Sequence, residues 1–248
     1  MSKLCLAVLI LLLTAVSAHA NTDDARLVQL MRIQSFGFSG TLLNNYNHIR
    51  TPFQQRSHES YRQHLHALNT MYRQTRMTVG AEDLRALNEL TEELEAMPQL
   101  DTVMSTTVLV YPAHLTNIYQ AQQRFEQSLA GYQETIDQRD DVVKTIDDLR
   151  LDLYKIMSLY SVSTFTGLAY LNEEDPDLTR LDGKIQEHFL TLEGQLPGLQ
   201  GDIEKIRNIY LFVQPKLVGL SRPWTPSAVV LFLTRAETAL KDLAGQTE

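Results

Sequence analysis

Apolar residues recur every three or four positions along most of the chain. Such spacing places them on one side of an α-helix and marks the seam between helices that pack nearly parallel or antiparallel. The longest stripes begin at Tyr61, Leu115, Val142 and Ile203. Sustained period-two alternation is missing, and the one strand-like run is 108–111. The sequence predicts an all-α protein, an elongated multi-helix bundle of antiparallel helices.

Three pairs of residues signal helix starts, because each places a capping side chain directly before a proline. They are Thr51-Pro52, Asp175-Pro176 and Thr225-Pro226. We expect the first helix to break near Gly37 and Gly40 and the fourth near Pro112. The expected helices cover about 23–49, 52–78, 81–96, 103–137, 139–171, 176–195, 198–220 and 226–243.

The middle of the chain contains similar segments about 90 residues apart. Asn117-Ile118-Tyr119 resembles Asn208-Ile209-Tyr210, and Gln123 and Gln214 follow at the same distance. These matches indicate two copies of a three-helix unit, about 52–137 and 139–222, within one domain that spans 21–248. The alternative is a chance likeness between heptad-like patterns, and the sequence leaves both open.

The first twenty residues have the pattern of a secretory signal peptide. Lys3 precedes an apolar run from Leu4 to Val16, which ends in Ala18-His19-Ala20. We expect cleavage after Ala20, which leaves 228 of the 248 residues. The protein would then be exported, and periplasmic in a Gram-negative cell. The remaining chain lacks a long apolar run, so we do not expect a transmembrane protein.

Composition excludes several classes of function. The leader contains Cys5, the only cysteine, so cysteine nucleophiles, disulfides and cysteine metal sites are excluded from the mature chain. Loss of Lys3 changes the net charge from −8 to −9. An acidic chain lacks the clustered cations that bind phosphate backbones, so a nucleic-acid partner is not expected.

The polar residues lack a recognisable catalytic or metal-binding motif. His58, His64 and His66 are spaced so that one helix cannot direct them to a common metal. The densest carboxylates, between Asp137 and Asp152, alternate with basic residues in the manner of an exposed helix face. We therefore expect neither an enzyme nor a cofactor, and no metal ligands.

Four stretches carry no charge: 33–49, 102–123, 156–172 and 223–234. They are rich in Ser, Thr, Asn, Gln and Tyr, which suits either inner helices or a binding surface. Tyrosine supplies apolar area with a polar tip at a low entropic cost. The candidate partner-binding or ligand-binding residues are Tyr46, Tyr111, Tyr119, Tyr160 and Tyr170.

The leading functional expectation is an exported, non-enzymatic interaction or accessory module that binds another protein of the cell envelope. It would present helix faces to the groove of its partner. The first alternative is a helical bundle that binds a small molecule in a Tyr-rich pocket. The second is a membrane-active bundle in which 156–172 or 226–234 leaves the fold. The oligomeric state stays open.

Overall fold

The computed structural model describes residues 3–47, 54–75, 77–97, 107–137, 139–164, 178–218 and 225–247, with backbone alone for 3–23, 47, 54–58 and 107–111. Over this part of the chain the protein is 92% helical, with eight α-helices and no strand, which confirms the all-α prediction. The helices are α1 (Lys3–Asn47), α2 (Gln54–Gln74), α3 (Ala81–Ala96), α4 (Thr107–Ile136), α5 (Asp141–Thr164), α6 (Leu178–Gln195), α7 (Gln200–Val218) and α8 (Pro226–Thr247).

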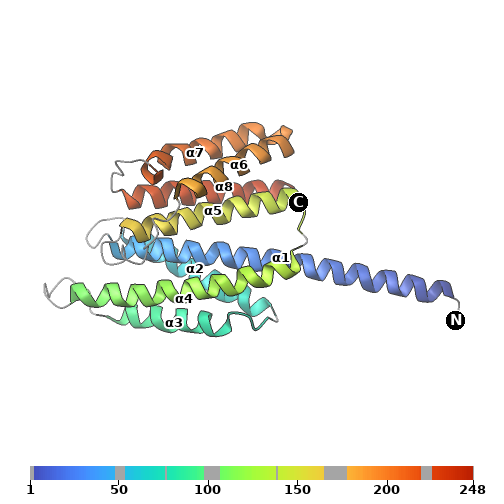
Figure 1. Ribbon diagram of the computed structural model, residues 1–248, viewed down its shortest axis with the longest axis horizontal. Coiled ribbons are helices and arrows are strands. Elements are labelled where there is room, and N and C mark those ends of the chain that lie inside the picture. Colours follow the sequence, from blue (N-terminus) through green and yellow to red (C-terminus); the bar gives the residue numbers. More distant parts are fainter. Residues whose placement is uncertain are drawn as a thin grey trace.

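The helices lie roughly side by side in an elongated bundle (Figure 1). α1 and α5 pack together at its centre, with α2, α3 and α4 on one side and α6, α7 and α8 on the other. α3 and α7 form opposite edges of the bundle, and the N-terminal part of α1 projects beyond it. None of the described helices is long and apolar enough to cross a membrane.

α1 is an inner helix, and it runs without a break through both glycines, contrary to the expected interruption. A methyl group on Gly37 would lie 2.7 Å from the His64 ring, and one on Gly40 would lie 2.7 Å from the Met157 side chain. The two glycines therefore allow α2 and α5 to approach the α1 backbone closely. They serve packing between helices rather than helix termination.

The expected break near Pro112 is also wrong. Pro112 lies within α4, which continues past it, because only one backbone hydrogen bond is lost near the helix start. The strand-like run 108–111 is part of the same helix, in agreement with the helix predicted there. β-branched side chains alone do not make a strand where the flanking sequence is helical.

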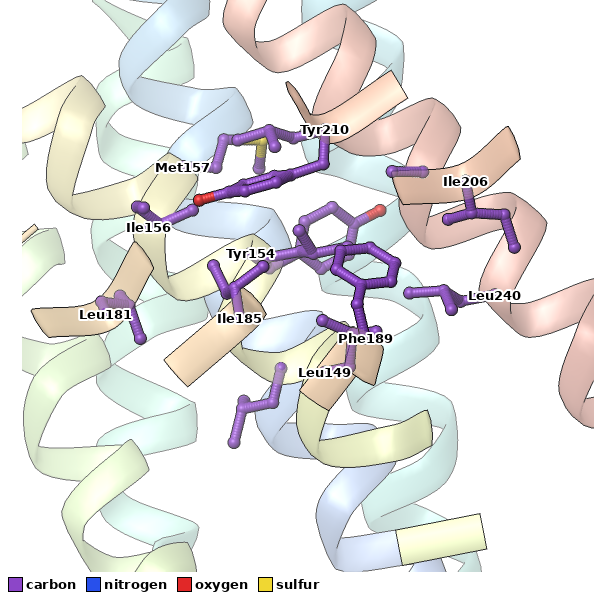
Figure 2. Close-up of a cluster of buried hydrophobic side chains, with 14 of the residues drawn as sticks. Leu149, Tyr154, Ile156, Met157, Leu181, Ile185, Phe189, Ile206, Tyr210 and Leu240 are labelled. Atoms are coloured by element: carbon purple, nitrogen blue, oxygen red, sulfur yellow. The ribbon is translucent and has the colours of Figure 1, made fainter. Parts of the chain in front are cut away.

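Two hydrophobic clusters make up the core, and α1 contributes to both. The first lies among α5, α6, α7 and α8 and contains Ile33 and Phe36 of α1. Figure 2 shows part of it, where the aromatic rings of Tyr154, Phe189 and Tyr210 gather. The second cluster lies among α2, α3 and α4, with α1 residues such as Val28. α1 is therefore the common wall of the two halves.

The predicted repeat corresponds to α2–α4 and α5–α7, and it stays a prediction. The matched residues differ in burial, since Ile118 is buried and Tyr119 half-buried, whereas Ile209 is half-buried and Tyr210 buried.

Candidate functional site: an aromatic patch on α7 and α8

The tyrosines named from the sequence do not gather on one exposed surface within the described residues. Tyr160 is fully buried, and its hydroxyl accepts a hydrogen bond from the Thr225 backbone N–H at 3.3 Å. Tyr46 and Tyr119 are half-buried against the second core cluster, and burial raises the pKa of Tyr119 to about 12. The Tyr111 side chain and all of Tyr170 lie outside the described residues.

The uncharged stretches are largely core where the structure describes them. Every residue from Ser35 to Asn45 is buried, and Ser35, Ser39 and Thr41 form internal hydrogen bonds. The Ser39 and Ser158 hydroxyls lie 2.6 Å apart between α1 and α5. Gln122 of α4 donates to the Ser35 hydroxyl at 3.0 Å. Small and neutral side chains are found here because helices cover α1 on several sides.

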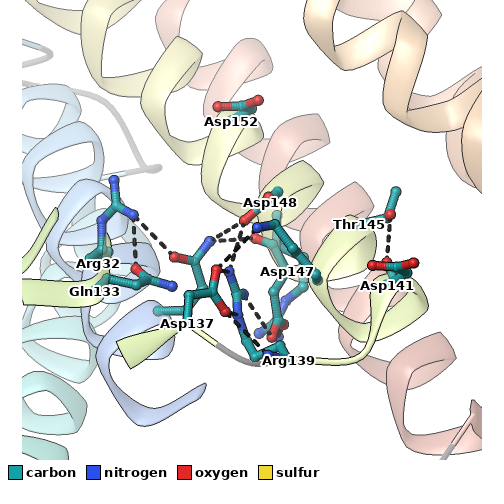
Figure 3. A network of polar contacts seen from close by, with 12 residues as sticks. Arg32, Gln133, Asp137, Arg139, Asp141, Thr145, Asp147, Asp148 and Asp152 are labelled. Carbon is teal, nitrogen blue, oxygen red and sulfur yellow. Dashed lines mark hydrogen bonds and ion pairs between the residues drawn. The ribbon is translucent and has the colours of Figure 1, made fainter. Parts of the chain in front are cut away.

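The expectation of an exposed face for the carboxylates between Asp137 and Asp152 is wrong for Asp147 and Asp152, which are buried and ion-paired. Asp140 and Asp141 are exposed. Arg150 of α5 lies 3.0 Å from Asp147 and 2.8 Å from Glu237 of α8. Arg139 pairs with Asp137 at 2.9 Å and with Asp148 at 3.3 Å, as Figure 3 shows. The i+3 spacing of Asp147 and Arg150 is typical of ion pairs on a solvent-exposed helix face, but α8 covers this part of α5.

The same polar region extends to α1 and α4. Arg32 donates to Glu126 at 2.6 Å and to Gln133 at 2.8 Å, and Gln29 donates to Asp148 at 2.9 Å. These bonds join the two halves of the molecule through side chains of α1, α4 and α5 (Figure 3).

The ion pairs suit a structural role better than acid–base chemistry. The Arg139 guanidinium holds the pKa of Asp137 well below its usual range, whereas burial raises the pKa of Asp147. Each of these carboxylates has an arginine within 3.0 Å. The described residues also hold no group of three His, Cys, Asp or Glu side chains that could bind a metal ion.

Two histidines make specific contacts inside the bundle. His64 of α2 donates from Nδ1 to the Gln34 amide oxygen, 2.7 Å away, and its ring packs edge-on against Tyr154. Burial lowers the pKa of His64 to about 4, so its ring is neutral at pH 7. His188 of α6 lies 3.2 Å from the buried carboxylate of Asp152.

An aromatic pair lies on the described surface of α7 and α8. Of the surface features described, it is the one that packing within the fold explains least. Phe212 is 60% exposed, and its ring lies 4.5 Å from that of Phe232, centroid to centroid. The Arg235 guanidinium lies over the Phe232 ring at 5.5 Å. Exposed apolar side chains that adjoin one another on a surface can mark an interaction site, whereas single ones are common.

Three more residues share this outer surface. Leu231, 38% exposed, is one turn before Arg235, and Lys216 is one turn after Phe212. We call Phe212, Lys216, Leu231, Phe232 and Arg235 the aromatic patch.

The aromatic patch is electropositive although the chain is acidic overall. α7 has no Asp or Glu from Lys205 to Val218, and α8 has none from Pro226 to Arg235. Within the described residues, neither Lys216 nor Arg235 has an acidic partner. Apolar area beside unpaired cations is an arrangement that can bind an acidic, partly apolar partner.

Sequence reasoning missed this patch, although a signal was available. Phe212 adjoins Val213, which belongs to the apolar stripe of α7, so on a helix Phe212 must point away from the buried side. A phenylalanine off the stripe is the mark of an exposed aromatic residue.

The chain was compared with protein-family models, with curated proteins and with solved structures, and none of them matches.

Proposed function

We propose that the protein is an exported, non-enzymatic interaction module that binds another protein of the cell envelope through the aromatic patch. The observation that carries the proposal is the exposed Phe212, whose ring packs against the half-buried Phe232 on an outer helix surface beside unpaired cations. Aromatic and arginine side chains dominate the binding energy of protein interfaces. The apolar and cationic side chains of the patch could bind an amphipathic helix of the partner.

The position of the leader supports export. The part of α1 that precedes residue 24 projects from the bundle, and the first buried residue described is Ala25. Cleavage after Ala20 would leave every described buried side chain in place. The other described features are structural in kind, since the buried charges are paired and the uncharged stretches are packed.

Site-specific photocrosslinking in living cells tests the proposal. A photoreactive amino acid replaces Phe212, and the matched control carries it at Glu204, which is also exposed on α7 but points elsewhere. We expect one dominant adduct at position 212 and none at position 204. The captured protein, purified, should bind the wild-type chain and lose at least tenfold in affinity with Phe212→Ala.

Equal adducts at both positions, or no adduct at position 212, would contradict the proposal. Because Phe212 is mostly exposed, its replacement costs little stability, so a loss of binding would not reflect unfolding.

A further inference from the structure

The edge of the bundle opposite α7 carries the opposite charge. Glu82, Glu89 and Glu93 of α3 are exposed and lie at positions i, i+7 and i+11, which places them on one outward face. Glu82 and Glu93 have no basic partner within the described part of the chain, and Glu89 has only the exposed Arg85 at 3.9 Å. We call these three glutamates the acidic face.

Partly exposed apolar side chains lie next to the acidic face. Ala86 and Leu90 are only half-buried against the second core cluster. α3 is therefore an amphipathic helix with a second, weaker apolar margin beside its glutamates. It is an example, within this same chain, of the kind of helix that the aromatic patch would bind.

We propose that the aromatic patch binds the acidic face of a second copy of this chain. Lys216 and Arg235 would face the glutamates of α3, while Phe212 and Leu231 would cover its apolar margin. The inference rests on the proposed function, because it uses the same patch as the docking surface. What it adds is the occupant, a second copy of the chain.

The two surfaces cannot meet within one molecule, because α3 and α7 lie at opposite edges of the bundle (Figure 1). A contact between unlike surfaces is heterologous and leaves one of each surface free on every dimer. The association therefore continues head to tail into rings or open chains instead of closing as a symmetric dimer. An envelope partner that binds the patch would compete with this self-association.

Salt dependence separates this contact from non-specific apolar association. Charge attraction between exposed groups extends over about 30 Å at roughly 0.01 M ionic strength and about 3 Å at roughly 1 M. Apolar aggregation does not weaken with added salt in this way. We expect the weight-average mass in sedimentation equilibrium to rise with protein concentration at the lower ionic strength and to return to the monomer value at the higher one.

Charge reversal provides the decisive experiment on the protein as purified from the cell. Lys216→Glu/Arg235→Glu reverses the patch, and Glu89→Lys/Glu93→Lys reverses the acidic face. We expect each variant alone to stay monomeric and an equimolar mixture of the two to associate again, because reversed surfaces then meet in complementary pairs. A variant that combines all four changes should also associate.

A matched control changes the net charge equally and leaves both surfaces unaltered. Arg73→Glu/Lys241→Glu replaces two exposed cations outside the patch, and it should associate as the wild-type chain does. Unchanged helical signal and melting temperature in every variant show that each is folded.

A wild-type chain that stays monomeric at low ionic strength overturns the inference, as does a mixture of reversed variants that fails to associate. The inference can fail while the proposed function stands. In that case photocrosslinking at position 212 captures a different envelope protein and the wild-type chain is monomeric. An adduct of twice the chain mass at position 212, lost with Glu89→Lys/Glu93→Lys, supports the inference.

Discussion

Arg150 connects two acidic side chains in the interior of the second half. Its side chain is 3% exposed and pairs with Asp147 on the same helix and with Glu237 on α8. Glu237 also accepts a hydrogen bond from the Tyr154 hydroxyl at 3.2 Å, and burial together with the Glu237 charge raises the pKa of Tyr154. The loss of the cation would leave the buried Glu237 without a counter-ion and Asp147 with the more distant Arg139, at 3.7 Å.

We expect Arg150→Met to lower the free energy of unfolding by about 3–5 kcal/mol, the usual cost of breaking a buried ion pair. Urea unfolding followed by circular dichroism measures it. The control is Arg85→Met, because Arg85 is 73% exposed and 3.9 Å from its partner. That change should cost less than about 0.5 kcal/mol. Similar losses in both variants would mean that the ion pairs around Arg150 are not important for stability.

His64 makes stability depend on pH. Its pKa in the folded protein is about 4, below the 6.5 of the exposed ring, because burial disfavours the imidazolium. The unfolded chain therefore binds the proton first, and the free energy of unfolding falls as pH drops from about 6.5 to about 4. The shift corresponds to about 3 kcal/mol at most.

The measurement is the difference in unfolding free energy between neutral and acidic pH. His64→Gln should reduce that difference, whereas His66→Gln should keep it, because His66 is exposed on the same helix. An equal acid sensitivity in His64→Gln and in the wild type would assign the effect to other groups.

At the residue scale the sequence predicted which apolar side chains are buried better than it predicted how the charged side chains interact. The apolar stripes are core, as the fully buried Tyr61, Leu149 and Val213 show. The spacing of Asp147 and Arg150 led to a wrong prediction of an exposed face, because the same i+3 pattern occurs both on exposed faces and in buried ion pairs. Only contact with α8 decides between them, and that contact joins residues 87 positions apart.

At the scale of helices, Gly37 determines how closely α2 approaches α1. A Cβ there would meet three atoms of the His64 ring between 2.7 and 3.1 Å. The ring cannot move aside easily, since it is held by Gln34 and packed against Tyr154. We expect Gly37→Ala to lower the free energy of unfolding by about 1–3 kcal/mol, as overpacking does.

The matched control for this change is Gly131→Ala in α4. A methyl group at Gly131 would have nothing within 4 Å, so higher helix propensity should raise the unfolding free energy by up to about 1 kcal/mol. Opposite signs in the two variants, measured by thermal unfolding, support the close approach of α2. A gain in both would contradict it.

Helix boundaries were predictable where local signals determine them. α3 begins at Ala81 and ends at Ala96, as predicted, since Gly80 adopts a positive φ of 75° directly before it. α8 begins at Pro226 as predicted, and the Thr225 carbonyl accepts from the amides of Ala228 and Val229. The expected break in α1 failed because tertiary contacts outweigh the low helix propensity of its glycines.

At the scale of the whole molecule, the proposed leader and the folded bundle share the helix α1. The proposed cleavage after Ala20 predicts that mass spectrometry of the mature protein finds Asn21 at the N-terminus. The chain 21–248 should melt within about 2 °C of the full chain, because its described buried contacts are the same. A retained leader, or a large drop in melting temperature without it, would contradict this expectation.

The central position of α1 determines when its contacts can form during synthesis of the chain. Ser39 reaches its partner Ser158 only after 119 further residues have been made, and Ser161 contacts Gly40 after 121. Until then the α5-facing side of α1 has no cover, and contacts of such long sequence separation form slowly. The nascent chain therefore stays incompletely folded while most of it is translated, which is the state that passes most readily through a narrow export channel.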